Sequence, residues 1–168
     1  MGSTVAKHVT GADISAGMLA HGRTKVEKAG LSDRIELIQA DAAELPFPDA
    51  SFDAITVAFG VRNFEDLARG IAGMVRVLRT GGRLFVLEFS RPQRTPFKQL
   101  FRFYFHRVMP LIGRLVSKDN AAYTYLPESV DAFPQGKAFE EVLNTCGLKE
   151  INSRLLTFGV ATLYMARK

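Results

Sequence analysis

The stretch DAAELPFPDASFDAITVAFGVRN, residues 41–63, decides how the chain folds. An apolar run precedes it at residues 35–38, and a second apolar run lies inside it from Phe52 to Phe59. Pro46 and Pro48 hold the loop between the two runs extended. Two β-like runs, each followed by polar residues, are typical of an open α/β sheet, in which ligands bind outside the carboxyl ends of the strands.

Length and composition favour one globular domain over residues 1–168. The chain has 47% apolar residues, enough for a core, and no apolar run long enough to span a membrane. Its one cysteine, Cys146, excludes an internal disulfide and fits a reducing compartment. We therefore expect a soluble, cytoplasmic protein.

The net charge of +5 is concentrated in one segment. Residues 91–118 contain no Asp or Glu and seven basic residues, namely Arg91, Arg94, Lys98, Arg102, Arg107, Arg114 and Lys118. The chain has 22 Lys and Arg in all, so 15 remain elsewhere against 17 Asp and Glu. A nucleic-acid-binding protein would spread a basic face over its fold. The local patch instead predicts contact with an anionic membrane surface or ligand, and no nucleic acid.

Strands and helices alternate in the first half of the pattern. We predict strands over residues 8–14, 34–40, 52–59 and 83–89, and helices over 15–30 and 65–78 with stops at Gly30 and at Gly81–Gly82. This alternation implies a parallel sheet with right-handed crossovers. The third strand suits a sheet that is buried on both faces.

The pattern changes after Ser90. Residues 95–116 are aromatic, basic and apolar, residues 117–133 are loop-like, and the pattern predicts a helix over 135–146. We interpret residues 91–133, approximately, as a basic aromatic cap. Two final strands, 148–155 and 160–166, are joined by so short a link that they must be antiparallel.

Several side chains near the predicted strand ends suit a nucleoside. Asp13 can accept two hydrogen bonds from ribose hydroxyls, and Met18 can pack on an adenine face. Asp41 and Ala42 can meet the adenine edge through a carboxylate and a backbone amide. The alternative for Asp13 is that it only caps the helix that follows. No His, Cys, Asp or Glu cluster has metal-ligand spacing, so we expect no metal and a reactive group carried by a cofactor.

Four segments resemble the ubiquinone/menaquinone biosynthesis C-methyltransferases. They are the quoted stretch with its FGVRN end, VLRTGGRLFVLEFSRP (77–92), KDNAAYTYLPESVDAFP (118–134) and LTFGVATLYMARK (156–168). The resemblance covers nearly all of the chain. In the segments QRTPFKQLF and SKDNAAYTYLPES, the sequence is closer to the menaquinone branch. It implies a class I S-adenosylmethionine-dependent methyltransferase with a Rossmann-like α/β sheet and an antiparallel last strand.

The resemblance also implies roles for individual residues. Asp13 would bind the ribose of S-adenosyl-L-methionine, with Met18 and Asp41–Ala42 at the adenine, and Ala58 would lie beside the methionine part. Many relatives have serine at the position of Ala58, so a side-chain hydrogen bond is absent here. Arg62 and Asn63 match a signature pair at the acceptor side, and we predict that they are the catalytic residues.

One departure from the family is large. Its members begin with a strand and a glycine-rich loop that holds the methionine end of the cofactor, and this chain has no room for them before His8. We therefore expect a sheet without its first strand, an N-terminally truncated chain, and a chain that by itself is inactive.

The implied reaction is methyl transfer to a ring carbon of demethylmenaquinol. Arg62 stays protonated and is a poor base, so we expect it to stabilise the developing phenolate while Asn63 orients the ring oxygen. Either residue can instead serve only to cap the next helix. The expected partners are a prenylated quinol and, through peripheral contact, the inner face of the membrane. A homodimer is a further possibility that the sequence does not decide.

Alternative interpretations stay open at this point. The ubiquinone branch would methylate a polyprenyl benzoquinol. A nicotinamide-dependent oxidoreductase also has an acid at the end of its second strand, but not the Asp41–Ala42 and FGVRN pattern. A non-catalytic fragment retained for protein contacts, or a peripheral membrane protein built around the basic segment, remains to be tested.

Overall fold

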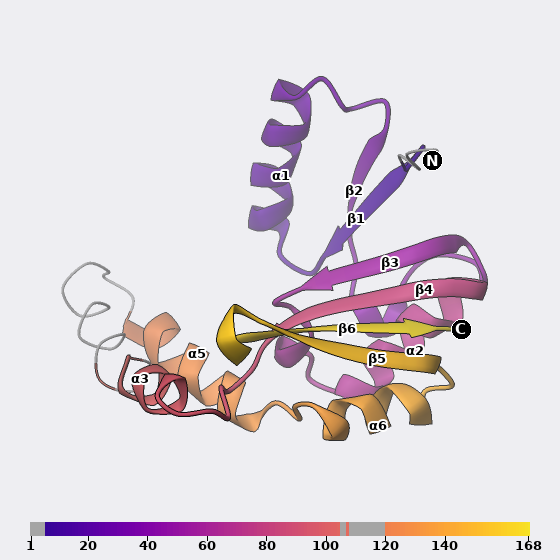
Figure 1. Ribbon diagram of the computed structural model, residues 1–168. Helices are drawn as coiled ribbons and strands as arrows, with labels where there is room; N and C mark the ends of the chain where they lie inside the picture. The colour runs from indigo at the N-terminus through magenta and orange to yellow at the C-terminus, as the bar shows by residue number, and fades with distance from the viewer. Residues whose placement is uncertain (1–5, 105–106, 108–119) are drawn as a thin grey trace, which may run out of the picture.

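The structure, a computed structural model, describes residues 6–104, 107 and 120–168 (Figure 1). Its strands are β1 (Val9–Asp13), β2 (Ile35–Gln39), β3 (Phe52–Ala58), β4 (Leu78–Phe89), β5 (Lys149–Leu156) and β6 (Ala161–Arg167). Its helices are α1 (Ala16–Lys28), α2 (Leu67–Val77), α3 (Phe97–Phe103), α5 (Asn120–Ala132) and α6 (Lys137–Thr145). Short 3₁₀ turns are η1 (Ala42–Glu44), η2 (Val61–Asn63) and η4 (Thr157–Gly159). Predictions for residues 105, 106 and 108–119 of the cap lie outside the described residues.

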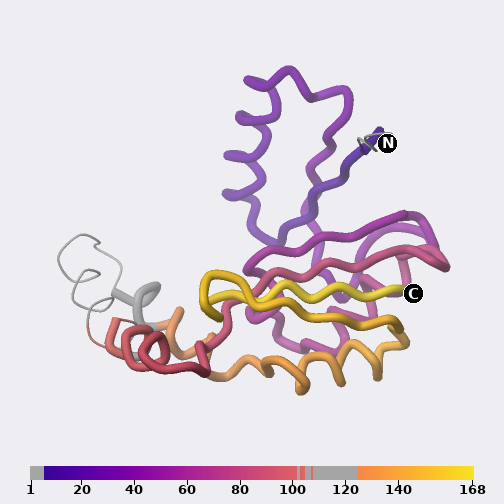
Figure 2. The backbone as a smooth tube through the Cα atoms, viewed as in Figure 1, coloured from indigo at the N-terminus to yellow at the C-terminus, as the bar shows by residue number. Residues whose placement is uncertain are grey.

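The strands form two separate sheets. β1 and β2 pair in parallel, while the second sheet has the order β3-β4-β6-β5. β3 is parallel to β4, and β6 is antiparallel to both of its neighbours, as the sequence predicts. Within the described residues no ladder joins β1 to β3, which confirms the expected interruption of the sheet. Figure 2 shows the β1–α1–β2 part standing apart from the four-stranded sheet.

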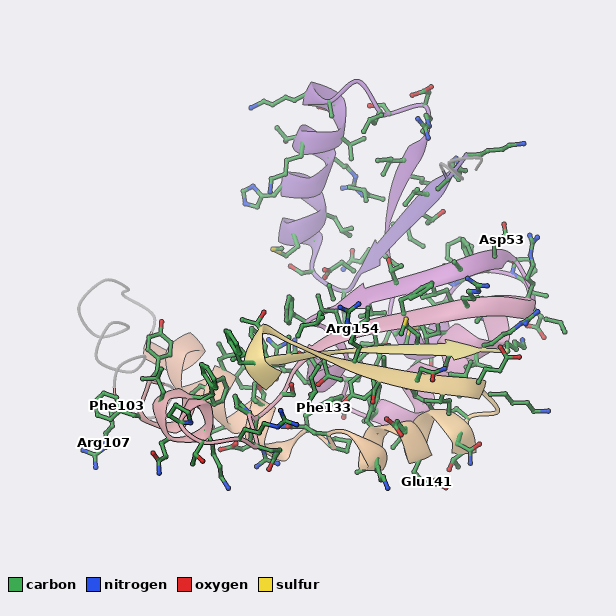
Figure 3. The ribbon with its side chains drawn as sticks, in the orientation of Figure 1. Asp53, Phe103, Arg107, Phe133, Glu141 and Arg154 are labelled. Atoms are coloured by element: carbon green, nitrogen blue, oxygen red, sulfur yellow. The ribbon has the colours of Figure 1, made fainter. Side chains whose placement is uncertain are left out.

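The core lies on one face of the four-stranded sheet. Buried side chains alternate along β4, and Leu84 and Val86 share a cluster with Tyr164 of β6. Ile71 of α2 and Phe139 of α6 complete this cluster, so both helices cover the same face. In Figure 3 the Glu141 side chain points away from the sheet, as the amphipathic pattern of α6 requires.

β3 differs from the prediction of a strand buried on both faces. Ile55 and Val57 pack against the core, but Ala54, Thr56 and Ala58 on the other face are exposed. The reason is the interrupted sheet, because α1 packs on β1 and β2 and leaves that face of β3 uncovered.

The boundary between α2 and β4 also differs from the prediction. The helix ends at Val77, and the strand begins at Leu78 rather than at Arg83. Gly81–Gly82, predicted to stop the helix, lies inside the strand instead. The cause is tertiary: Leu78 is fully buried opposite Phe52, and Lys168 Nζ donates to the Leu78 carbonyl at 2.7 Å.

The prediction of a loop over residues 117–133 is wrong for residues 120–132, which form α5. Pro127 favoured the loop prediction, because a proline inside a helix removes one N–H donor and its ring crowds the carbonyl four residues earlier. The helix forms because Val130 and Phe133 at its end are buried in the protein, and such packing outweighs local propensity. Within the described residues no helix is both long and apolar enough to cross a bilayer.

Candidate functional site

The carboxyl ends of β1 and β2 place two acidic side chains at one edge. Asp13 pairs with Gln39 in register, and Ala40 N donates to the Asp13 carbonyl at 3.2 Å. Asp41 follows one residue later and begins η1, so both carboxylates lie at the same end of the two-stranded sheet. This is the neighbourhood that the sequence predicts for a nucleoside.

Asp13 does serve as a local cap, but with one oxygen only. Its Oδ1 accepts a hydrogen bond from Ser15 N at 2.7 Å, and Ser15 Oγ accepts from Met18 N at 3.3 Å to begin α1. Oδ2 of Asp13 makes no hydrogen bond within the described residues. The Met18 side chain is 62% exposed on the first turn of α1. The carboxylate oxygen and the thioether are thus both open to a ligand.

Asp41 and Ala42 are held by the close approach of α2. Asp41 Oδ1 accepts from Ala43 N at 2.8 Å, which fixes the η1 turn. A Cβ atom on Gly73 would lie 2.1 Å from the Ala42 carbonyl oxygen, so only glycine allows the helix to pack here. The second acidic group is therefore positioned by α2 as well as by its own strand.

Ala58 ends β3 in the other sheet. Because β3 pairs with β4 and not with β1, the structure does not bring Ala58 into the sheet of Asp13 and Asp41. The next residue, Phe59, has a left-handed backbone with φ of 55°, and its N–H donates to the Leu87 carbonyl at 2.8 Å. This turn directs the chain into η2, which carries Arg62 and Asn63.

Arg62 is paired with a buried acid that the sequence reasoning missed. Arg62 Nη1 lies 2.8 Å from Glu88 Oε1, and the backbone N–H of Arg62 donates to Glu88 Oε2 at 3.3 Å. The two side chains are 11% and 0% exposed. The guanidinium also lies over the Phe89 ring, 5.3 Å from its centroid. Glu88 therefore neutralises Arg62 and fixes its orientation.

A signal for Glu88 was present in the sequence. It lies in the strand segment RLFVLEF at the spacing of the core-facing Leu84 and Val86. An acid at a core-facing position needs a cationic or hydrogen-bonding partner, because an unpaired buried charge is costly. Which partner it takes depends on the turn at Phe59, and local pattern does not predict that turn.

Asn63 is joined to the cap through α5. The hydroxyl of Tyr125 donates to Asn63 Oδ1 at 3.0 Å, across 62 positions of sequence. The backbone of Asn63 is fixed separately, since its N–H donates to the Gly60 carbonyl at 3.0 Å. The sequence reasoning placed Tyr125 in a loop and gave it no role.

A cavity of about 410 Å³ lies between η2 and α5. Its lining residues are Val61, Arg62, Phe64, Glu65, Leu67, Tyr125, Glu128, Ser129, Ala132, Phe133 and Pro134. This volume is in the range of small-molecule sites, and the lining combines apolar residues with polar ones such as Arg62, Tyr125 and Ser129. Arg62 is the predicted site residue that lines it.

Comparison with known proteins connects these features to one family. The model of the ubiE/COQ5 methyltransferase family matches residues 2–168. The chain is 51% identical over 162 residues to the demethylmenaquinone methyltransferase of Bacteroides fragilis, covering 96% of this chain and 66% of that protein. It is 44% identical to the ubiquinone/menaquinone biosynthesis C-methyltransferase UbiE of Geobacter sulfurreducens, covering 95% of this chain and 62% of that protein.

Solved structures agree on the fold at low identity. A SAM-dependent methyltransferase from Aquifex aeolicus matches with a TM-score of 0.63 and 16% identity, over 95% of this chain and 68% of that chain. The [4+2]-cyclase SpnF matches with a TM-score of 0.71 and 18% identity, over 98% of this chain and 67% of that chain. The chain thus has a class I methyltransferase α/β fold and spans about two thirds of the length of its relatives. It belongs to the ubiE/COQ5 methyltransferase family.

Proposed function

We propose that this chain carries most of an S-adenosylmethionine-dependent enzyme that methylates a ring carbon of demethylmenaquinol to form menaquinol. The observation that carries the proposal is the Arg62–Asn63 pair, fixed by Glu88 and Tyr125 beside the 410 Å³ cavity. The names of the relatives from Bacteroides fragilis and Porphyromonas gingivalis, 51% and 46% identical, support the substrate.

The described residues fit one half of the cofactor. Asp13 Oδ2 and the exposed face of Met18 suit a ribose hydroxyl and an adenine ring, and Asp41–Ala42 suit the adenine edge. For the methionine end, the described residues include no glycine-rich loop, and Ala58 offers no side-chain hydrogen bond. We propose that Asp13, Met18, Asp41 and Ala42 hold the nucleoside and that Ala58 borders the methionine part.

The chemistry of the acceptor side follows from the donors at η2. S-Adenosylmethionine, when bound, supplies a methyl group whose bonding electron pair stays with sulfur, while the ring carbon supplies the pair for the new bond and then loses its proton. The ring carbon becomes nucleophilic as an adjacent hydroxyl approaches a phenolate. Arg62 Nη2 makes no hydrogen bond within the described residues and can donate to that oxygen. Asn63 can donate through Nδ2, which lowers the energy of the developing charge.

Methyl transfer from labelled S-adenosylmethionine to a short-chain demethylmenaquinol tests the proposal. The measurement uses the 168-residue chain and an extended chain, in which this sequence is joined to the part of the Bacteroides fragilis relative that it does not match. We expect label in the quinol with the extended chain. Arg62→Lys should lower kcat about 10–100-fold with little change in cofactor affinity, because lysine lacks the planar fork. Absence of transfer by the extended chain would refute the proposal.

The ubiquinone branch is the second candidate, because the Geobacter sulfurreducens relative carries both names. A competition experiment with equal concentrations of demethylmenaquinol and a prenyl methoxybenzoquinol separates the two acceptors. We expect label mainly in the naphthoquinol. A product ratio that favours the benzoquinol would assign the chain to the other branch.

We also propose that the cap contacts an anionic membrane from which a prenylated quinol is taken. On α3, Leu100 and Phe103 are 64% and 61% exposed. Phe103 and Arg107 lie together at the end of the molecule away from the sheet (Figure 3). Each nearby Lys or Arg adds about 1 kcal/mol of attraction at an anionic surface.

Flotation with phosphatidylglycerol vesicles at low salt tests this contact. Phe103→Ser combined with Lys98→Glu should abolish flotation, whereas Lys149→Glu, the same charge change on the exposed start of β5, should not. If the unsubstituted chain, the double variant and Lys149→Glu floated equally, the membrane contact would be removed from the proposal.

A further inference from the structure

Tyr125 is the point at which the cap reaches the predicted acceptor residues. It lies on α5, whose end is held in the core by Val130 and Phe133, 1% and 5% exposed. Its hydroxyl donates to Asn63 Oδ1 at 3.0 Å. This packing fixes the end of the helix, while the Tyr125 side chain itself is 51% exposed and is held by its contact with Asn63.

The hydrogen bond in the structure engages the oxygen end of the Asn63 amide. An asparagine side chain offers an acceptor oxygen and a donor nitrogen, and rotation about its last bond exchanges the two. In the structure the Tyr125 hydroxyl donates to Oδ1, which turns Nδ2 away from Tyr125, whereas in the flipped amide Nδ2 would donate to the hydroxyl oxygen and turn the carbonyl outward. Nδ2 makes no hydrogen bond within the described residues, so its two donors are left for a ligand.

The need for a donor follows from the acceptor chemistry. An oxygen that moves from phenol to phenolate gains negative charge and is stabilised by N–H donors, whereas a carbonyl oxygen in the same place would repel it. A preorganised donor is effective because it does not have to reorient as the charge develops. A freely rotating Asn63 would present its oxygen to the ring part of the time.

We propose that Tyr125 is a positioning residue that holds Asn63 with its Nδ2–H groups toward the oxygen of a phenolic acceptor. This inference rests on the proposed function for the identity of the acceptor, but the contact itself is independent of it. Tyr125 does not touch the reacting atoms in this arrangement. It acts only through Asn63, and that dependence can be measured.

A double-mutant cycle in the extended chain tests the dependence. We expect Tyr125→Phe to lower kcat about 10-fold, the range for one lost hydrogen bond between neutral groups, and KM to change less than about 3-fold. In an Asn63→Ala background the same substitution should change kcat less than about 2-fold, because the partner is gone. Full additivity of the two substitutions, or an unchanged kcat in Tyr125→Phe, would overturn the proposal.

Asn63→Asp gives a second, directional test. Aspartate can still accept from Tyr125 but presents a carboxylate oxygen where the amide presents donors. We expect kcat to fall by about 100-fold or more. Activity retained within about 3-fold would show that no donor is needed from this position.

Side-chain amide NMR signals of Asn63 provide a readout without substrate. Tyr125→Phe should shift the Nδ2–H₂ signals and speed their solvent exchange in the extended chain. Tyr164→Phe is the matched control, because it removes a hydroxyl bonded to Gly136 N in the core. If the Asn63 amide signals of Tyr125→Phe stay where they are in the unsubstituted protein, the contact is refuted. If instead the unsubstituted extended chain transfers no methyl group, the proposed function is refuted, but a shift of the NMR signals would still support the contact.

Discussion

At the scale of single residues, the Arg62–Glu88 pair should contribute strongly to stability. Both side chains are nearly removed from water, so removing one charge leaves the other buried without compensation. We expect Glu88→Ala to lower the free energy of unfolding by about 3–5 kcal/mol, and Glu88→Gln by less because the amide still accepts a hydrogen bond. Urea denaturation monitored by circular dichroism measures the difference.

The matched control for this pair is exposed. Arg79 and Asp53 form an ion pair whose side chains are 49% and 80% exposed, at the start of β3 where Figure 3 labels Asp53. Asp53→Ala should change the free energy of unfolding by less than about 1 kcal/mol, because water screens the interaction. If Glu88→Ala had as small an effect, the buried pair would not stabilise the turn at Arg62.

Tyr164 predicts a pH dependence at the same scale. Burial raises the pKa of its phenol above the ordinary value of 10.0, although the hydrogen bond from Gly136 N partly opposes the shift. The unfolded chain then loses this proton at a lower pH than the folded protein. The stability that Tyr164 contributes should therefore be fully present below about pH 10 and be lost as the pH rises above it. Tyr164→Phe should make the unfolding free energy less dependent on pH above 10, and an equally steep loss would contradict the assignment.

At the scale of elements, two helical glycines should respond oppositely to alanine. A Cβ on Gly73 would meet the Ala42 carbonyl at 2.1 Å, so Gly73→Ala must move α2 away from η1. We expect a loss of about 1–3 kcal/mol in the free energy of unfolding. At Gly17 in α1 the nearest atom is Ser15 Oγ at 3.8 Å, and Gly17→Ala should raise stability by about 0.4–1 kcal/mol. Thermal unfolding of both variants compares them, and equal effects would refute the close packing.

At the scale of the whole molecule, the divided sheet should limit cofactor binding and favour association. Within the described residues, β1 and β3 each pair on one side only, and open strand edges can pair with another chain. We expect the 168-residue chain to give no calorimetric signal with S-adenosylmethionine up to about 1 mM, and light scattering to detect dimers or larger species. Tight binding by a monomer would show that the cofactor site is complete without a further strand.

Much of the fold could be predicted because its signals are local. Ser15 and Gly30 mark the ends of α1 through capping chemistry, and the short link at Thr157–Gly159 requires an antiparallel last pair. The predictions failed where packing overrides propensity, namely at Pro127 inside α5 and at Gly81–Gly82 inside β4. For the candidate site, the structure places the ends of β1 and β2 side by side, with Asp13 at one and Asp41 just after the other, and the roles of both residues stay predictions.

By itself, the sequence determined the family, the alternation of strands and helices, and which strand ends carry acidic side chains, because these depend on residue types at short spacing. Only the tertiary structure decided the partners of Arg62 and Asn63. Glu88 lies 26 positions from Arg62, and Tyr125 lies 62 positions from Asn63. Each contact depends on how β4 and α5 pack against η2. Such packing is a property of the folded core, in which many side chains fit together at once, and no local pattern along the chain encodes it.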